Sequence, residues 1–249
     1  MELEGKVALV TGGSGDLGGA ICRALGRQGM TVAVTYLGER ERAEAVVADV
    51  ASAGGRGWAV RLDQSDIAQT ERVVEETVAR LGRLDVLVNN AATNQGVPFK
   101  DLDGLTAEVW DRLYATNLRG PYLLARAAAR PMRKQGSGRI VNISSAGGTH
   151  PISSSIAYSC TKAAVMHLTR CLAVALAPEV LVNCVAPGLV EGTRMSNRIP
   201  AKSIKKALGS AVLERGATAV DVAEEVVPFC RTDSATGQVL AVDAGLFVH

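Results

Sequence analysis

The chain has few aromatic residues, few histidines and almost no excess of either charge. Aromatic residues make up 4% of the 249 positions, and 27 lysines and arginines balance 25 aspartates and glutamates, for a formal net charge of +2. This balance gives no electrostatic argument for a nucleic-acid partner or an anionic membrane surface. The 3 histidines lack metal-ligand spacing. We therefore predict that the protein binds neither nucleic acid nor a metal ion.

Paired cysteines and long apolar runs are also missing. The 5 cysteines are scattered, odd in number and without a C-x-x-C pair, which is typical of reduced thiols in a reducing compartment. No apolar run is long enough to span a bilayer. The first residues enter a strand directly, without the basic and apolar regions of a signal peptide. These absences favour a cytoplasmic protein without membrane association.

Short β-branched runs alternate with longer helical segments along the chain. In "DIAQTERVVEETVARLG", for example, apolar residues recur at three- and four-residue steps, which indicates an amphipathic helix. The expected strands are Val7–Thr11, Thr31–Thr35, Gly57–Arg61, Val86–Asn89, Arg139–Ile143, Val180–Val185 and Val239–Val242. Several are apolar at consecutive positions, as strands covered on both faces are. The pattern predicts a Rossmann-type, doubly wound α/β fold, with a seven-stranded parallel sheet and helices on both faces.

No linker, repeat or low-complexity tract interrupts this pattern, so residues 1–249 are interpreted as one domain. The most irregular stretch runs from Gly188 to Gly209 and separates two expected strands without adding one. Long irregular connections of this kind are usually functional. We therefore predict a mobile substrate flap at about residues 189–208.

The stretch "VTGGSGDLGGAI", Val10 to Ile21, follows the first strand and opens a helix. Gly12 and Gly13 permit a tight turn with close backbone approach, and Gly18 permits close packing of the helix against the strand. Such a turn presents backbone N–H groups at the positive end of a helix, which suits a pyrophosphate. The spacing is not G-x-G-x-x-G, so the loop alone fits either a dinucleotide site or a structural turn.

Several motifs together resemble the short-chain dehydrogenase/reductase family. "TGGSGDLG" resembles its T-G-x-x-x-G-x-G loop, and "NNAA" at 89–92 resembles its N-N-A-G segment. "YSCTK" at 158–162 matches the family's Y-x-x-x-K motif, and Ser145 lies at the usual distance before that motif. Asn117, in "ATNLRG", lies where the family has its structural and catalytic asparagine. "VAPGLVEGT" and "TGQVLAVDAG" match its late segments. The motifs cover the whole chain in the family's order, and the wider match is closest to 3-oxoacyl-[acyl-carrier-protein] reductases.

The resemblance implies the catalytic residues Asn117, Ser145, Tyr158 and Lys162. Tyr158 and Lys162 share a face of the expected helix, and a nearby ammonium lowers the pKa of a phenol from its usual value of about 10. Tyr158 would be the general acid in ketone reduction and the base in reverse. Ser145 would hold the substrate oxygen, Lys162 the nicotinamide ribose, and Asn117 a water that links Lys162 to solvent. Taken singly, Ser145 could instead end a strand, Asn117 could bond backbone at a helix bend, and Tyr158 could be half-buried packing.

The resemblance also implies a set of cofactor contacts. They are Gly12, Gly13, Ser14, Gly15, Asp16, Leu17, Gly18, Asp63, Asn90, Tyr158, Lys162, Val190 and Thr193. Asp63 would contact adenine, although it could also cap the next helix, a role that Ser65 or Asp66 serves better. Asn90 would approach a ribose, and the two late residues would contact the nicotinamide carboxamide.

Three positions depart from the family pattern. Ala92 and Ala244 are small residues that replace glycine, whereas Asp16 places a carboxylate in the glycine loop. Two interpretations of Asp16 are open. Its carboxylate accepts backbone N–H bonds at the helix start and points away from the phosphates, or it repels the diphosphate and weakens cofactor binding. We favour the capping interpretation.

The choice between NAD and NADP depends on the end of the second strand, "TVAVTYLGERER". An acidic residue there bonds the adenosine 2′-hydroxyl and repels a 2′-phosphate, but the first acid is Glu39. NADP signals are also weak, because Gly15 and Leu37 lie where many family members carry a basic residue. Arg40 or Arg42 would reach the 2′-phosphate of NADP. Alternatively, both are charged side chains on the solvent-exposed face of a helix. We predict NADP as the preferred cofactor, with NAD as the alternative.

The sequence as a whole predicts an NAD(P)-dependent oxidoreductase that interconverts a ketone and a secondary alcohol. The expected substrate is a small-molecule or carrier-bound carbonyl compound: a 3-oxoacyl group on carrier protein or CoA or a polyketide-type ketone, or alternatively a sugar, polyol or other alcohol. A catalytically silent dinucleotide-binding module is the alternative of another class, supported by Asp16 alone. The resemblance also implies a homotetramer formed through the two long helices and the last strand, and the alternative is that the two helices are ordinary core helices.

Overall fold

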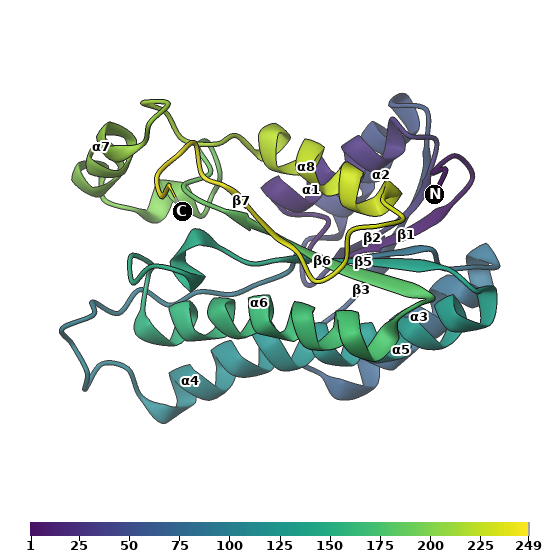
Figure 1. Ribbon diagram of the computed structural model, residues 1–249, viewed down its shortest axis with the longest axis horizontal. Helices are drawn as coiled ribbons and strands as arrows, with labels where there is room; N and C mark the ends of the chain where they lie inside the picture. The colour runs from purple at the N-terminus through teal and green to yellow at the C-terminus, as the bar shows by residue number, and fades with distance from the viewer. Residues whose placement is uncertain (249) are drawn as a thin grey trace.

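The computed structural model describes residues 1–248, so residue 249 of the predicted domain lies outside the described part. Its strands form a parallel sheet in the order β3-β2-β1-β4-β5-β6-β7 (Figure 1). The strands are Val7–Val10 (β1), Thr31–Tyr36 (β2), Arg56–Arg61 (β3), Val86–Asn89 (β4), Gly138–Ile143 (β5), Val180–Pro187 (β6) and Val239–Val242 (β7). The seven predicted strands are confirmed, and their ends shift by one or two residues at most.

Helices cover both faces of the sheet (Figure 1). One face carries α1 (Asp16–Gly26), α2 (Arg40–Ser52) and α8 (Ala219–Arg231). The other carries α3 (Ile67–Leu81), α4 (Ala107–Tyr114), α5 (Gly120–Gln135) and α6 (Ile156–Leu176). Side chains alternate along β1, so that Ala8 and Val10 enter the core on the α1 side and Val7 and Leu9 the core on the α3 side. The Rossmann-type, doubly wound fold is confirmed.

The strand order places a crevice beside β1. From β1 the chain continues through β2 to β3 on one side, and it then returns to β4 on the other side of β1. Val10 pairs with Val88, and the Thr11 N–H donates to the Val88 carbonyl at 2.9 Å. Ligands of open α/β sheets bind where the strand order reverses, outside the carboxyl ends of the strands. The glycine loop and the segment after β4 therefore meet at this crevice.

The predicted flap, residues 189–208, is more regular than its sequence indicates. It contains a 3-10 turn at Ser196–Arg198, and its last part belongs to α7 (Ala201–Ser210), which lies at one end of the molecule near the C-terminus (Figure 1). Val190 forms an isolated bridge with Ala217. None of the helices within residues 1–248 is long and apolar enough to cross a membrane.

Ala244 follows β7 in a backbone conformation that favours glycine. Its φ is +57°, in the left-handed region, which costs a residue with a Cβ about 1–2 kcal/mol. The alanine that replaces the family's glycine at this position therefore lowers stability, although the sequence suggests a neutral exchange of one small residue for another. We expect Ala244→Gly to raise the free energy of unfolding by about 1 kcal/mol, because the relief of strain exceeds the entropy that glycine adds to the unfolded chain.

Urea denaturation of the two chains would measure this change. Ala241→Gly in β7 is the matched control, since glycine inside a strand lowers stability by about 0.5–1 kcal/mol. Equal destabilisation by both substitutions would contradict strain at Ala244.

Candidate active site

Tyr158 and Lys162 lie in the first turns of α6, beside the end of β5. The Ser155 hydroxyl caps the helix by accepting the Tyr158 N–H at 3.3 Å. Lys162 is 3% exposed, and its Nζ donates to the Ile143 carbonyl at 2.9 Å and lies 5.7 Å from the centre of the Tyr158 ring. The side chain of Ser145 lies beside the Tyr158 phenol and acts to lower its pKa. The fold thus brings together three of the four predicted catalytic residues.

Burial controls the ionisation of this pair. It raises the pKa of Tyr158 to about 12, against the opposing effect of the hydrogen bond to Ser145. It also lowers the pKa of Lys162 to about 8, against the opposing effect of Cys184. The pKa of the phenol is therefore raised overall and not lowered as predicted for these residues by themselves, because desolvation of the phenolate outweighs the stabilising groups. At neutral pH the phenol keeps its proton, the form that can protonate a carbonyl oxygen.

Ser145 follows β5 and has two hydrogen-bonding roles. Its Oγ accepts the N–H of Gly147 at 3.1 Å, at the start of a 3-10 turn, and its hydroxyl also meets Tyr158. Ser145 thus has the structural role and also lies beside Tyr158. The hydroxyl of the adjacent Ser144 donates to the carbonyl of Lys162 at 2.7 Å.

Asn117 lies in a π-helical turn, Ala115–Arg119, between α4 and α5. Its Nδ2 donates to the Thr93 carbonyl at 2.8 Å and to the Thr161 hydroxyl at 3.3 Å, and its Oδ1 accepts the Thr93 N–H at 2.9 Å. The side chain therefore fastens the loop after β4 to α6, next to Lys162. This is the structural interpretation of Asn117, and it makes the side chain a positioning group for that part of the site.

The glycine loop is held against the segment after β4. Gly12 has φ +62°, and a Cβ there would lie 3.0 Å from Ala91 Cα, while a Cβ at Gly18 would lie 2.1 Å from the Gly12 carbonyl oxygen. Asn90 Nδ2 donates to the Thr11 carbonyl at 2.8 Å, and Thr11 Oγ1 accepts the N–H groups of Asn90 and Ala91, both at 2.9 Å. The sequence did not single out Thr11, although it opens the T-G motif.

Other loop residues are fixed by β2 and the core. A Cβ at Gly13 would lie 2.8 Å from Val34 Cγ1, so glycine permits close packing there. The Ser14 N–H donates to the Thr35 carbonyl at 3.2 Å, and the partly buried Leu17 packs against the core on the α1 side. These contacts fix the glycine loop against β2 and the core.

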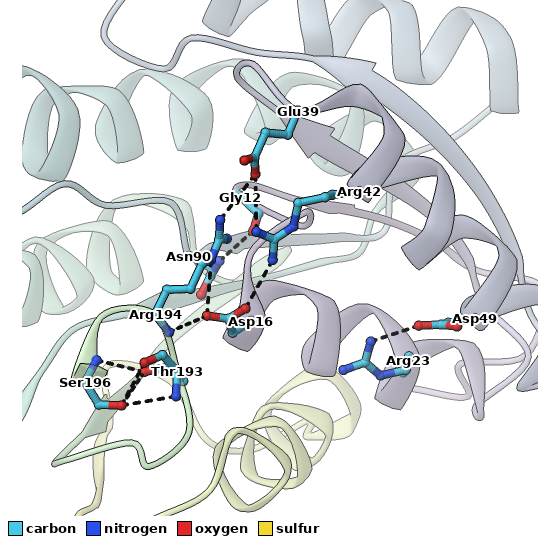
Figure 2. A network of polar contacts seen from close by, with 10 residues as sticks. All are labelled: Gly12, Asp16, Arg23, Glu39, Arg42, Asp49, Asn90, Thr193, Arg194 and Ser196. Atoms are coloured by element: carbon cyan, nitrogen blue, oxygen red, sulfur yellow. Dashed lines mark hydrogen bonds and ion pairs between the residues drawn. The ribbon is translucent and has the colours of Figure 1, made fainter. Parts of the chain in front are cut away.

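Asp16 does not cap α1. The helix begins at Asp16 with Gly15 as its N-cap and without a side-chain hydrogen bond at that cap among the described residues. The carboxylate turns outward, and its Oδ2 accepts the Arg194 N–H at 2.7 Å while Oδ1 accepts from Arg42 Nη2 at 3.2 Å (Figure 2). The favoured capping interpretation is wrong, because these donors from the flap and α2 bind the carboxylate instead. The Asp16 carboxylate therefore accepts no N–H group of the described residues at the start of α1, and the positive end of a helix suits an anion such as a pyrophosphate.

Asp63 lies beyond the end of β3 and binds within its own turn. It accepts the N–H and hydroxyl of Ser65 at 2.9 and 2.6 Å. Asp66 caps α3, by accepting the N–H groups of Ala68 and Gln69. The alternative of Asp63 as the helix cap is therefore excluded.

Val190 and Thr193 lie in the first part of the flap. Thr193 is 7% exposed, and its hydroxyl donates to the Val190 carbonyl at 3.0 Å and lies 3.2 Å from the Ser196 hydroxyl (Figure 2). These bonds shape the turn after β6. The sequence missed the next residue, Arg194, whose contacts with the glycine loop have no local sequence signal.

Groups suited to metal binding do not gather at the site. Within residues 1–248, no cluster of three or more histidine, cysteine, aspartate or glutamate side chains is placed to hold a metal ion. Of the cysteines, Cys22, Cys184 and Cys230 are buried, whereas Cys160 and Cys171 are exposed on α6.

A doubly wound sheet, a glycine loop at its switch point and a buried Tyr–Lys pair beside it define a dinucleotide-binding oxidoreductase. The sequence pattern of the short chain dehydrogenases matches residues 6–203, and the chain belongs to this family. The resemblance found in the sequence is confirmed, and with it the enzyme class. Members of this family use NAD or NADP.

Two curated relatives align over nearly the whole chain. A Streptomyces violaceoruber protein assigned as a ketoacyl reductase of granaticin polyketide synthase is 37% identical over 243 residues, 97% of this chain and 96% of the relative. A 3-oxoacyl-[acyl-carrier-protein] reductase of Staphylococcus aureus is 34% identical over 247 residues, 98% of each chain.

Solved structures show the same architecture. A short chain dehydrogenase from Burkholderia cenocepacia in complex with NADP has a TM-score of 0.90 and 34% identity, over 99% of each chain. An NAD⁺-bound xylitol dehydrogenase has a TM-score of 0.92 and 26% identity, over 98% of this chain and all of the other. Both cofactors thus occur among similar structures.

Proposed function

We propose that this enzyme prefers NADP and reduces a ketone to a secondary alcohol, and that it also catalyses the reverse oxidation. The buried pair of Tyr158 and Lys162 at the end of β5, with Lys162 Nζ 5.7 Å from the centre of the Tyr158 ring and Ser145 beside the phenol, carries the proposal. The bound nicotinamide would supply the hydride. Tyr158 gives its proton to the carbonyl oxygen while the Ser145 hydroxyl donates a hydrogen bond to the same oxygen. The Lys162 ammonium stabilises the phenolate that remains.

The residues around the crevice fit a dinucleotide. The open N-terminus of α1 and the loop Gly12–Gly18 would hold the pyrophosphate. Asp63 would hold adenine, Asn90 a ribose, and the turn at Val190 and Thr193 the carboxamide. The proposed enzyme consists of one domain, in which residues 189–208 would form the substrate flap.

The proposed substrate is a 3-oxoacyl group on carrier protein or CoA, or a polyketide-type ketone. Support comes from the two curated relatives, which are assigned to ketoacyl and 3-oxoacyl reduction. We further propose a homotetramer formed through α5, α6 and β7. In support of it, Tyr122 on α5, Val174 on α6 and Leu240 on β7 are large apolar side chains that are 44%, 84% and 38% exposed.

The NADP preference rests on Arg42. Its guanidinium binds Asp16 at the start of α1 and Glu39 after β2, at 3.2 and 3.3 Å. It therefore lies between the glycine loop and the β2 end, where an adenosine 2′-phosphate is recognised. Arg40 instead pairs with Glu44 along α2 and is 69% exposed.

Enzyme assays with a panel of 3-oxoacyl thioesters, sugars and polyols, each with both cofactors, test the proposed function. We expect oxidation of NADPH with the thioesters, and a higher kcat/KM for NADPH than for NADH. Arg42→Ala should lower kcat/KM for NADPH by about tenfold, the cost of one charge-assisted hydrogen bond, and Arg40→Ala should leave it unchanged. Turnover confined to polyols, or equal use of both cofactors, would contradict the proposal.

A further inference from the structure

Asp16 joins two parts of the chain that are 178 positions apart. Its Oδ2 accepts the main-chain N–H of Arg194 at 2.7 Å, and Arg194 Nε lies 3.4 Å from the same oxygen (Figure 2). Arg194 directly follows Thr193, for which the family resemblance implies contact with the nicotinamide carboxamide. The glycine that the family carries at position 16 has no side-chain oxygen that could accept this bond.

Asp16 and Arg194 belong to a closed set of four charges. Arg194 Nη1 lies 3.2 Å from Glu39 Oε2, Arg42 Nη1 lies 3.3 Å from the same oxygen, and Arg42 Nη2 lies 3.2 Å from Asp16 Oδ1. Two carboxylates and two guanidiniums thus alternate, so the set carries no net charge. It ties the flap to the start of α1 and to the start of α2.

The contacts of this set differ in strength. The Asp16 carboxylate is 29% exposed, whereas Arg194 and Glu39 are 49% and 61% exposed, and exposed ion pairs contribute little. A main-chain N–H that donates to an ionised carboxylate forms a stronger bond. Partial burial acts to raise the pKa of Asp16, but the Arg194 N–H and the charges of Arg194 and Arg42 outweigh it and the pKa is lowered. Asp16 is therefore ionised at neutral pH, and its bond to the Arg194 N–H is the main connection.

We propose that Asp16 is a positioning residue, which fastens the substrate flap at Arg194 to the cofactor loop. The inference rests on the proposed function, because it concerns where Thr193 and the flap lie when the cofactor and substrate bind. Holding this turn in advance reduces the conformational entropy that binding would otherwise remove. Asp16 acts on binding of both ligands through the flap, and it takes no part in the proton transfer.

Hydrogen exchange of the protein without ligands and steady-state kinetics test this role together. We expect Asp16→Ala to raise exchange of the amides between 190 and 200 by about tenfold, and to raise KM for cofactor and substrate several-fold with kcat nearly unchanged. Asp16→Asn keeps an acceptor oxygen and should restore most of the protection. Arg194→Ala keeps the main-chain N–H donor, so most of the protection against exchange should remain.

Asp49→Ala is the matched control, since Asp49 pairs with Arg23 between the same two helices at 3.1 Å and is separate from the flap (Figure 2). It should change neither exchange nor KM. Unchanged exchange in Asp16→Ala would overturn the inference, and so would tighter cofactor binding, the result expected if Asp16 repels the diphosphate. Because exchange is measured without turnover, its outcome is independent of whether the proposed reaction is found.

Discussion

Replacing Tyr158 by phenylalanine is expected to lower kcat for ketone reduction by about 10³-fold. A positioned general acid contributes about 10²–10⁴-fold, and the Tyr158 hydroxyl is the group that meets Ser145 at the end of β5. Steady-state kinetics with the substrate found in the panel measures the loss. The effect should fall on kcat, because the proton moves only in the chemical step.

The fold should survive this substitution, since phenylalanine keeps the buried ring, which is 8% exposed. Thermal melting and NADPH fluorescence in the binary complex check the fold and cofactor binding. Tyr114→Phe is the matched control, as Tyr114 is 52% exposed at the end of α4, and it should retain full activity. Activity of Tyr158→Phe within tenfold of the original enzyme would mean that another group donates the proton.

Gly18→Ala is expected to damage both stability and cofactor binding. A Cβ at this position would lie 2.1 Å from the carbonyl oxygen of Gly12 and 2.8 Å from Asn90 Nδ2. The carbonyl of Gly12 belongs to the main chain, and Asn90 Nδ2 is held by its hydrogen bond to the Thr11 carbonyl, so the loop itself must shift. Overpacking of this kind costs about 1–3 kcal/mol, and a displacement of about 1 Å in a binding loop costs on the order of 10²-fold in function.

Urea denaturation and titration with NADPH measure the two effects. Gly209→Ala in α7 is the control, because an added Cβ there would meet no atom within 4 Å and alanine favours a helix by about 1 kcal/mol. We expect this control to be neutral or slightly stabilising. If Gly18→Ala bound NADPH with unchanged affinity, the close contact of α1 with the loop would not shape the site.

How far the sequence predicts the site is clearest for α6. Tyr158 and Lys162 are one helical turn apart, so helix geometry alone places them on one face. Their pKa values depend instead on burial, which arises only when α6 packs on the sheet. The local sequence pattern therefore predicts the spacing of the two side chains, but it does not predict that both are shielded from solvent.

The amino-acid sequence by itself determined the elements with strong local causes. The β-branched runs set the strands, Asp66 caps α3, and Gly12 permits the turn with φ +62°. The tertiary structure alone decided the partner of Asp16, because Arg194 lies 178 positions away and their spacing along the chain carries no signal. It also decided the left-handed φ of Ala244, since that conformation goes against the residue's own preference and is imposed by the surrounding fold.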